Sequence, residues 1–283
     1  PLRRQRQMCI RDRDYADRYD DFAQHAADQG YYVVANDHLG HGASVITDDQ
    51  HGYFAHPNGN ECVIADIHTL RTMTQKKYPD LPYFFLGHSM GSFLTRQYIQ
   101  MHADGLSGAI IMGTGSQPGI ILHIGKLICR TIALFRGWTY RSAFVDNMAF
   151  GGYNKQFEPA RTPSDWLTKD EAIINTCIHH PWSTFRFTVN GYYQMFRGIQ
   201  YIQNPAHIQQ IPKNLPLFFV AGGDDPVGNN GKSVTQVCQQ YKAAGIQDVQ
   251  IKLYPGDRHE ILNETDRDVV YADLLTWLNG HLA

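Results

Sequence analysis

The stretch FFLGHSMGSF, residues 84–93, contains the pattern that decides the fold. An apolar run typical of a buried strand leads directly into a G-x-S-x-G sequence, and apolar residues at helical spacing follow it. This order predicts a nucleophile elbow, a strained turn that lifts Ser89 above the sheet. The neighbouring elbow residues are Gly87, His88 and Gly91, and glycines at the two outer positions let the strand and the helix approach closely.

Ser89 is expected at the start of a helix, where unpaired amides and the helix dipole stabilise developing negative charge. We therefore predict that the backbone N–H of Met90, the residue after the serine, is one oxyanion donor. Two glycines around a serine also occur in ordinary turns, so it is the strand-turn-helix context that favours a catalytic interpretation.

A serine hydroxyl is a weak nucleophile and needs a histidine base that a carboxylate orients, in the chain order serine, acid, histidine. Of the 14 histidines, we predict His259 as the base, because it lies in the loop YPGDRHE after the last expected strand; the alternative is a surface histidine. We predict Asp225 as the acid, because Pro226 fixes its direction at the end of a strand. Asp224 stays open as an alternative, and both aspartates can also be simple turn residues.

Strands and helices alternate along most of the chain. Strands are expected at residues 31–35, 83–86, 108–112, 217–221 and 249–254, and helices at residues 18–30, 60–74, 90–102 and 233–244, with a last helix from about Glu264. We expect Asn60 to cap the second of these helices. The alternation predicts an α/β fold with a mostly parallel sheet, helices on both faces, and active residues at the carboxyl ends of the strands.

Residues 114–212 interrupt this alternation with mostly helical or irregular, aromatic-rich sequence. We interpret them as a cap inserted over the site, between core segments at residues 15–113 and 213–283. Four of its residues suit an acyl-chain pocket, although ordinary packing uses the same types: Tyr192, Tyr193, Met195 and Phe196.

One expected helix of the cap is amphipathic and basic. Its apolar residues are Ile120, Ile121, Ile124, Leu127, Ile128 and Leu134, and its basic residues are His123, Lys126 and Arg130. Such a helix can make transient contact with a membrane surface. The commoner arrangement packs the apolar residues against the core and leaves the basic face in solvent.

The composition is that of one globular core carrying an insertion, since 43% of the 283 residues are hydrophobic and the formal charge is −2. Lysines and arginines are scattered, which argues against a nucleic-acid partner. The five cysteines lie far apart, as free thiols in a reducing compartment do. No apolar run reaches the roughly 20 residues that span a bilayer, and we expect a cytoplasmic location.

The first residues, 1–13, show neither strand alternation nor a helical apolar face. The string MCIRDR, residues 8–13, resembles the translated sequencing-adapter sequence found at the ends of some reading frames assembled from environmental DNA. We therefore expect residues 1–14 to be a non-native leader and the native N-terminus to be missing.

Three other motifs suggest cofactors, but each departs from the required pattern. The sequence HEILN, residues 259–263, lacks the second histidine of a zinc-protease helix. The sequence GKS, residues 231–233, lacks the first glycine of a phosphate-binding loop, because that position is Pro226. Residues 37–44 hold two histidines and two glycines, which fit a glycine-rich turn beneath the active site better than a metal site. We expect no cofactor and no metal.

Several motifs in combination resemble those of the bacterial lysophospholipase and monoacylglycerol-lipase-like α/β-hydrolases, from about Tyr15 to the end of the chain. They are RYDDFA (18–23), NDHLGHGAS (36–44), FFLGHSMGSF (84–93), AFGGYNKQFEPARTPSDWL (149–167), FTVNGYY (187–193), AGGDDPVGNNGK (221–232) and YPGDRHEILNE (254–264). The resemblance implies an α/β-hydrolase fold, the triad Ser89, Asp225 and His259, and a cap that shapes the substrate pocket. It also implies small-molecule ester substrates, namely lipid monoesters such as monoacylglycerols or lysophospholipids.

The chain departs from that family at its front. Relatives carry one or more strands and a His-Gly loop before the region equivalent to Arg18, and that loop supplies the second oxyanion N–H. We expect this chain to lack them, which would expose a sheet edge and cost about 100- to 1,000-fold in turnover.

Two other functions stay open beside serine-dependent ester hydrolysis through an acyl-enzyme. An aminopeptidase of the same fold needs an acidic cluster in the cap to hold a substrate amine, and the candidates are Glu158, Asp165, Asp170 and Glu171. These acids are also typical of solvated helix ends. The other alternative is a non-catalytic binding protein that keeps the fold and the pocket.

Overall fold

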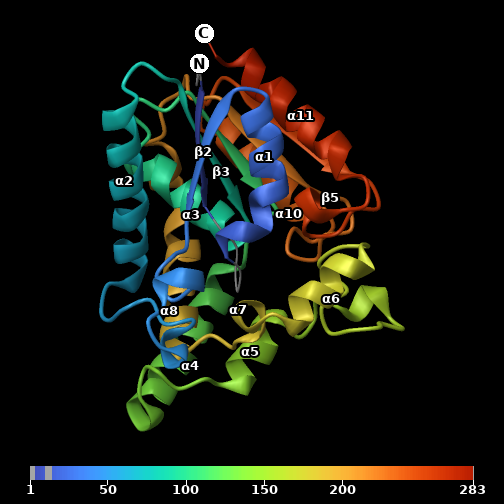
Figure 1. Cartoon of the computed structure of the whole chain (residues 1–283). Helices are drawn as coiled ribbons and strands as arrows, with labels where there is room; N and C mark the ends of the chain where they lie inside the picture. The colour runs from blue at the N-terminus through green and yellow to red at the C-terminus, as the bar shows by residue number, and fades with distance from the viewer. Residues whose placement is uncertain (1–3, 10–14, 283) are drawn as a thin grey trace.

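The computed structural model describes residues 4–9 and 15–282, and its centre is one six-stranded sheet (Figure 1). The strands are β1 (Arg4–Cys9), β2 (Tyr31–Asn36), β3 (Tyr83–His88), β4 (Gly108–Met112), β5 (Leu217–Gly222) and β6 (Val249–Tyr254). Their order is β2-β1-β3-β4-β5-β6, and every neighbouring pair is parallel. The predicted α/β class with a mostly parallel sheet is confirmed.

Helices cover both faces of the sheet, as predicted. The α-helices are α1 (Asp20–Asp28), α2 (Gly59–Lys77), α3 (Met90–Met101), α4 (Gly119–Arg136), α5 (Ala143–Phe150), α6 (Glu171–His179), α7 (Pro181–Thr184), α8 (Val189–Ile202), α9 (Pro205–Ile208), α10 (Lys232–Ala243) and α11 (Arg267–Gly280). Short 3-10 turns are η1 (Ala16–Tyr19), η2 (Gly42–Ser44), η3 (Asp48–Gln50), η4 (Lys155–Phe157) and η5 (Ile261–Asn263).

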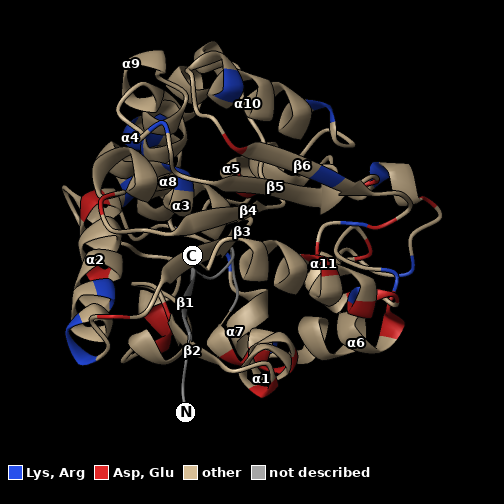
Figure 2. Cartoon of the chain, turned by 90° about the horizontal axis from the view of Figure 1, so that it is seen from above, with Lys and Arg blue, Asp and Glu red and all other residues tan. Residues whose placement is uncertain are grey.

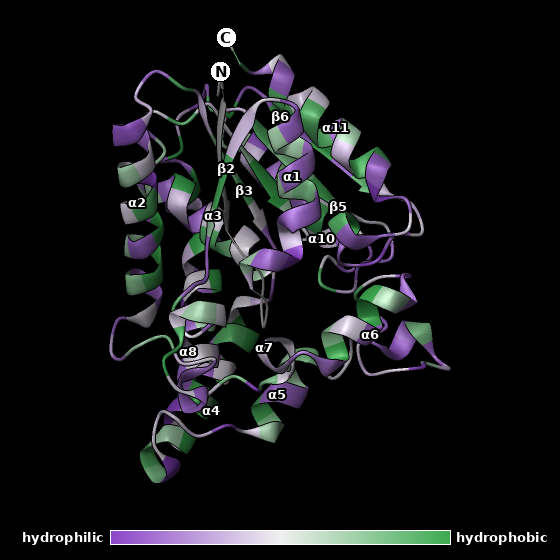
Figure 3. Cartoon of the chain, viewed as in Figure 1, coloured by the Kyte–Doolittle hydropathy of each residue, from purple (hydrophilic) through white to green (hydrophobic). Residues whose placement is uncertain are grey.

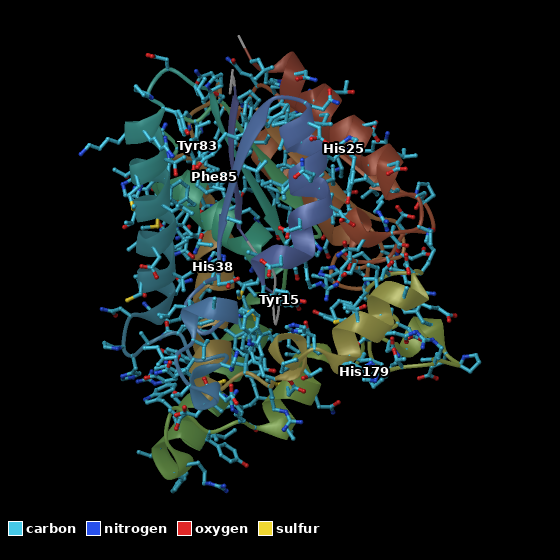
Figure 4. All side chains as sticks on the ribbon, viewed as in Figure 1. Tyr15, His25, His38, Tyr83, Phe85 and His179 are labelled. Carbon is cyan, nitrogen blue, oxygen red and sulfur yellow. The ribbon has the colours of Figure 1, made fainter. Side chains whose placement is uncertain are left out.

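The alternation of side chains along each strand divides the core into two halves. On β3, Tyr83 and Phe85 pack on the side of α2, α3 and α10 (Figure 4), whereas Phe84 and Leu86 pack on the side of α1 and α11. Figure 2 shows α1 and α11 on one side of the sheet and α3 and α10 on the other. A sheet covered on both faces needs strands that are apolar throughout, and β3, β4 and β5 are buried along their whole lengths.

The segment at residues 4–9 corrects the expectation that the first 13 residues fit no element. It forms the inner strand β1, paired with β2 on one edge and β3 on the other, so those two strands have no exposed edge between them. Its sequence, RQRQMC, lacks the apolar pattern of an inner strand. Backbone hydrogen bonding is independent of side-chain type, so pattern analysis misses such a strand. The proposed non-native origin of residues 1–14 stays a prediction.

Asn60 was expected to cap α2, but the helix already begins at Gly59 and its N-cap residue is Asn58, whose side chain makes no capping bond. Asn60 is instead buried inside the molecule, where its side-chain oxygen accepts a 2.8 Å hydrogen bond from Gln97 of α3. Tertiary packing therefore uses this amide in place of helix capping.

Residues 114–212, called the cap segment below, contain α4 to α9, and the helices α4 to α7 lie beyond the carboxyl ends of the strands (Figure 1). Within it, α8 packs against both α4 and α3, so this helix joins the segment to the core. In the described part of the chain, no helix combines the length and the apolar character needed to cross a lipid bilayer.

The orientation of α4 contradicts the commoner arrangement expected from its sequence. The helix buries Leu122, Gly125 and Cys129. Its exposed residues include most of the predicted apolar face, with exposed fractions of 68% for Ile120, 50% for Ile121, 49% for Ile124, 65% for Leu127 and 80% for Leu134, while Ile128 is partly buried. Figure 3 shows the hydropathy of the residues along this helix. Lys126 and His123 instead make polar contacts with Gln200 of α8. The apolar face therefore points outward, while Lys126 of the basic face lies against α8.

Candidate active site

Ser89 lies in a strained turn between β3 and α3. Its φ of 54° and ψ of −118° lie outside the regions that L-residues usually adopt. A Cβ at Gly87 would lie 2.2 Å from both the carbonyl oxygen of Gly91 and Oγ1 of Thr95, so only glycine fits this position. Met90 begins α3, and its amide is therefore one of the first four in the helix, which have no partner within the helix.

His259 and Asp225 form a buried pair. Their Nδ1 and Oδ1 atoms are 2.9 Å apart, and both side chains are fully buried. The same Asp225 oxygen accepts a 2.9 Å bond from the amide of Val227, which orients the carboxylate. Asp224, the alternative left open by the sequence, is exposed. The structure therefore brings Asp225, and not Asp224, to the histidine.

His88 lies between the elbow and the histidine loop. Its Nδ1 is 3.0 Å from the hydroxyl of Tyr19, its Nε2 is 2.9 Å from the carbonyl oxygen of His259, and the His88 and His259 rings lie 4.6 Å apart. The sequence predicted His88 only as an elbow residue. No spacing rule indicates its link to residues 19 and 259, because three segments distant in sequence meet there.

A cavity of about 300 Å³ has Ser89 in its wall. Most of its other lining residues are apolar, including Phe93, Leu122, Phe150, Trp166, Met195 and Phe196. The ring of Trp166, which also lines this cavity, lies 5.1 Å from the His259 ring. Met195 and Phe196 are thus in the predicted pocket. Tyr192 is instead buried and bonded to Asp146, and Tyr193 packs against Trp138.

A second cavity of about 450 Å³ adjoins the first, because Phe150 and Trp166 line both. Its lining is more polar and includes Asp146, Asn147, Ser164, Ser183 and Arg186. The two cavities therefore offer an apolar and a polar compartment on either side of two aromatic residues.

The loop at residues 37–44 holds two buried histidines, His38 (Figure 4) and His41, and the latter contacts Phe185 and Phe187 of the cap segment. Burial lowers the pKa of His38 to about 3 and that of His41 to about 4, so both rings are neutral at pH 7. His41 packs among Phe54, Phe185 and Phe187. This environment fits the predicted structural turn. A metal site needs several ligand side chains together, whereas His41 is surrounded by phenylalanine rings.

One cluster of acids among the described residues has the spacing of a metal site, formed by Asp257, Glu264 and Asp266. The ammonium of Lys169 lies 2.6 Å from Asp257 and within 3.8 Å of the other two carboxylates. Lys169 therefore supplies the positive charge that these acids need.

The predicted lack of a His-Gly loop before Arg18 concerns residues 10–14, which lie outside the described residues.

Comparison with known proteins places the chain among ester-cleaving enzymes. Residues 9–266 match the family model described as serine aminopeptidase, S33. Mouse monoglyceride lipase is 33% identical over 279 residues, which cover 95% of this chain and 80% of the mouse protein. The monoacylglycerol lipase of Mycolicibacterium smegmatis is 25% identical over 281 residues, covering 95% of this chain and 85% of that protein.

Solved structures show the same likeness in three dimensions. A thermostable carboxyl esterase from Bacillus coagulans, in complex with glycerol, superimposes with a TM-score of 0.92 and 29% identity, covering 99% of this chain and 91% of that one. A monoglyceride lipase from Saccharomyces cerevisiae, in complex with a substrate analog, gives a TM-score of 0.77 at 21% identity, covering 99% of this chain and 88% of that one. The second likeness concerns the fold alone.

Proposed function

Because the chain belongs to the serine aminopeptidase S33 family of α/β-hydrolases, we propose a serine-dependent mechanism and a lipid monoester substrate for it. The chain is a carboxylic ester hydrolase, as are its relatives named as lipases and esterases. The proposed substrates are monoacylglycerols or lysophospholipids, cleaved through an acyl-enzyme. The observation that carries this proposal is the buried Asp225–His259 pair beside a serine in a strained elbow.

The geometry supports one distribution of roles. A carboxylate oxygen accepts hydrogen bonds, so Nδ1 of His259 donates to Asp225 and Nε2 is left as the base. His259 then takes the proton of Ser89 as its oxygen attacks the acyl carbon, and returns a proton to the leaving alcohol. The amide of Met90 donates to the oxyanion at the start of α3. Water then attacks the acyl-serine by the same base catalysis and releases the acid.

The two cavities support a substrate with unlike ends. The apolar compartment beside Ser89 suits an acyl chain, since its walls are mostly aliphatic and aromatic. The compartment beyond Phe150 and Trp166 offers carboxylate, amide and guanidinium groups, from residues such as Asp146, Asn147 and Arg186, to a hydrophilic alcohol. A lipid monoester combines these two parts in one molecule.

An aminopeptidase activity lacks such support. Its candidate acids, Glu158, Asp165, Asp170 and Glu171, line neither cavity among the described residues. Asp170 instead caps α6 by accepting from two backbone amides, and Asp165 accepts from the amide of Arg161. These are the structural roles that the sequence also allowed.

We also propose that α4 makes transient contact with a lipid surface. Its exposed apolar residues continue into α5, where Phe144 is 65% and Met148 40% exposed. Ile121 and Met148 belong both to this patch and to the wall of the cavity that contains Ser89. An apolar patch that borders the cavity would place a monoester near the serine as it leaves a membrane or micelle.

A reducing compartment such as the cytoplasm is proposed for the chain. The structure describes the side chains of four cysteines, Cys62, Cys129, Cys177 and Cys238, and all four are free thiols. Free cysteines are typical of proteins from reducing environments.

Labelling with a fluorophosphonate probe tests the mechanism. The chain and its Ser89→Ala variant are compared after circular dichroism has shown that both are folded, and mass spectrometry locates the adduct. Stoichiometric labelling at Ser89, absent from the variant, is expected. A folded chain that does not label would favour a non-catalytic binding protein. Matched ester and amide substrates then separate an esterase from a peptidase.

A further inference from the structure

A short part of the cap segment, residues 165–170, lies along the loop that carries His259. The amide of Glu260 donates to the carbonyl of Leu167 at 2.7 Å, and Oγ1 of Thr168 donates to the carbonyl of Asn263 at 2.9 Å. The cap segment is therefore bonded directly to the loop of the proposed base.

One ion pair in this junction joins a partly exposed lysine to a buried carboxylate. The Nζ atom of Lys169 lies 2.6 Å from Oδ1 of Asp257, whose side chain is fully buried, and 3.8 Å from the equally buried Glu264. The carboxylates of Asp257, Glu264 and Asp266 have oxygens within 4.8 Å of one another. Three carboxylates this close repel each other, so the ammonium of Lys169 holds together a group that would otherwise separate.

Asp257 lies where the loops of the acid and the base meet. It is two residues before His259, and its carbonyl accepts a 2.9 Å hydrogen bond from the amide of Asp224, the residue before Asp225. The space is tight, because a Cβ on Gly222 would lie 2.3 Å from the carbonyl oxygen of Asp257. A displacement of Asp257 would therefore move both members of the catalytic pair.

We propose that Lys169 is a positioning residue for the Asp225–His259 pair and acts on it through Asp257. This inference rests on the proposed serine-hydrolase function. It makes the cap segment part of the machinery that sets the base, so that a cap displaced from the core would also misplace His259. Lys169 touches neither the pair nor the cavity beside Ser89.

The charges around Asp257 give this role a signature in pH dependence. The groups that act on it are Lys169 from the cap segment, Glu264 and Asp266 from the loop before α11, and Tyr254 at the end of β6. Burial raises the pKa of Asp257 to about 6, although Lys169 opposes the rise. Without Lys169 the pKa would rise further, so Asp257 would ionise only at higher pH, beside Glu264 and with no cation. A variant without Lys169 should therefore lose activity as pH rises. The pH–activity profile of the wild-type chain should lack this decline.

The test compares Lys169→Met with Lys169→Arg, with the double variant Lys169→Met/Asp257→Asn, and with Lys252→Met as a matched control. Lys252 also pairs with a carboxylate, that of Asp273, but on the surface of β6. We expect Lys169→Met to lower kcat about 10- to 100-fold with little change in KM, because a misplaced base impairs chemistry more than binding. Arginine at position 169 should restore most of kcat, and the double variant should restore part of it by removing the unpaired carboxylate.

Two further readouts separate this role from simple stabilisation and from failure of the proposed function. The downfield proton resonance of a hydrogen-bonded histidine Nδ1–H should be present in the wild-type chain and broadened in Lys169→Met. Thermal unfolding of both lysine variants measures any general loss of stability. If Lys169→Met leaves kcat, the pH profile and the resonance unchanged while the wild type still labels with the fluorophosphonate, the role of Lys169 is overturned. The proposed function then stands. A wild type that shows the resonance but never labels at Ser89 would overturn the proposed function, and the resonance of Lys169→Met would still decide whether Lys169 positions the pair.

Discussion

The Nε2 atom of His88 lies 2.9 Å from the carbonyl oxygen of His259. A carbonyl only accepts, so Nε2 of His88 carries a proton and donates it, while Nδ1 lies 3.0 Å from the hydroxyl of Tyr19. The residue before the nucleophile is thereby bonded to the main chain of the proposed base. A movement of the elbow would therefore also move the loop that carries His259, because the imidazole of His88 is bonded to that loop.

Replacement of His88 by leucine should lower both stability and turnover. It removes the two hydrogen bonds and leaves polar atoms of buried groups at residues 19 and 259 without these partners, at a cost of about 1 to 3 kcal/mol for each such group. Glutamine, which offers both a donor and an acceptor, should be tolerated better. Chemical denaturation and the rate of fluorophosphonate labelling measure the two effects. Equal labelling rates in wild type and leucine variant would refute the coupling.

The two neighbouring aspartates offer a matched pair of substitutions. Asp225→Asn keeps the shape of the side chain but favours the wrong histidine tautomer, so kcat should fall by about 10,000-fold. Asp224→Asn changes an exposed side chain and should leave kcat within about twofold. Steady-state hydrolysis of a chromogenic ester by both variants checks this. If Asp224→Asn lowered kcat far more than Asp225→Asn did, Asp224 would be the acid that orients His259.

Most of the fold and site could be predicted because the responsible signals are local. Apolar strands and turn residues predicted every strand from β2 to β6, and β4 and β6 agree residue for residue with the expected ranges. The order of acid and histidine along the chain predicted Asp225 and His259, whose side chains the structure pairs, whereas the catalytic role of Ser89 stays a prediction. Pro226 indicated the buried aspartate of the pair.

The features that could not be predicted depend on contacts between distant segments. Strand β1 is held by backbone pairing with β2 and β3, which its polar side chains do not indicate. The outward apolar face of α4 depends on how this helix packs against α8, where Gly125 meets Phe196 and Lys126 meets Gln200. The ion pair of Lys169 with Asp257 joins residues 88 positions apart, which no periodicity connects.

Gly87→Ala should distort the elbow. The added methyl group would meet the backbone of α3 at 2.2 Å, so the helix must shift, at an expected cost of about 1 to 3 kcal/mol and with a large loss of labelling. Gly119→Ala is a suitable control, because a Cβ there has no neighbour within 4 Å and alanine favours a helix. Denaturation midpoints and labelling rates of both variants test the prediction, and an elbow variant as stable and as reactive as the control would contradict it.

The buried histidines make stability depend on pH. For His41 the folded-state pKa of about 4 lies below the ordinary value of 6.5, so the unfolded chain binds more protons and stability falls as pH falls from 6.5 towards 4. At pH 5 this histidine should account for a loss on the order of 1 to 2 kcal/mol relative to pH 8.

His41→Phe removes the titrating group while keeping a ring among Phe54, Phe185 and Phe187. The unfolding free energy of this variant, measured by denaturation at pH 8 and pH 5, should depend less on pH than that of the wild type. His179→Gln changes an exposed histidine of α6 and should leave the dependence unaltered (Figure 4). An identical pH dependence in wild type and His41→Phe would show that this ring does not titrate on unfolding.

The exposed face of α4 should matter for lipid-bound substrate and not for dissolved substrate. Replacing Ile124 and Leu127 by serine removes two apolar side chains that are 49% and 65% exposed, so the fold should be retained. Binding to vesicles of neutral and anionic phospholipids, measured by sedimentation, should weaken several-fold, because the loss of apolar area reduces insertion at the interface.

Ile46→Ser provides the control, since Ile46 is 89% exposed but lies in a loop outside the cap segment. Hydrolysis of a short, soluble ester should be equal in all three proteins, whereas hydrolysis of a monoester presented in vesicles should fall only in the α4 variant. If the α4 variant loses both activities together, the substitutions have damaged the cavity wall, and surface docking is not their cause. If it loses neither activity and still binds vesicles, the apolar face of α4 is not the surface that meets lipid.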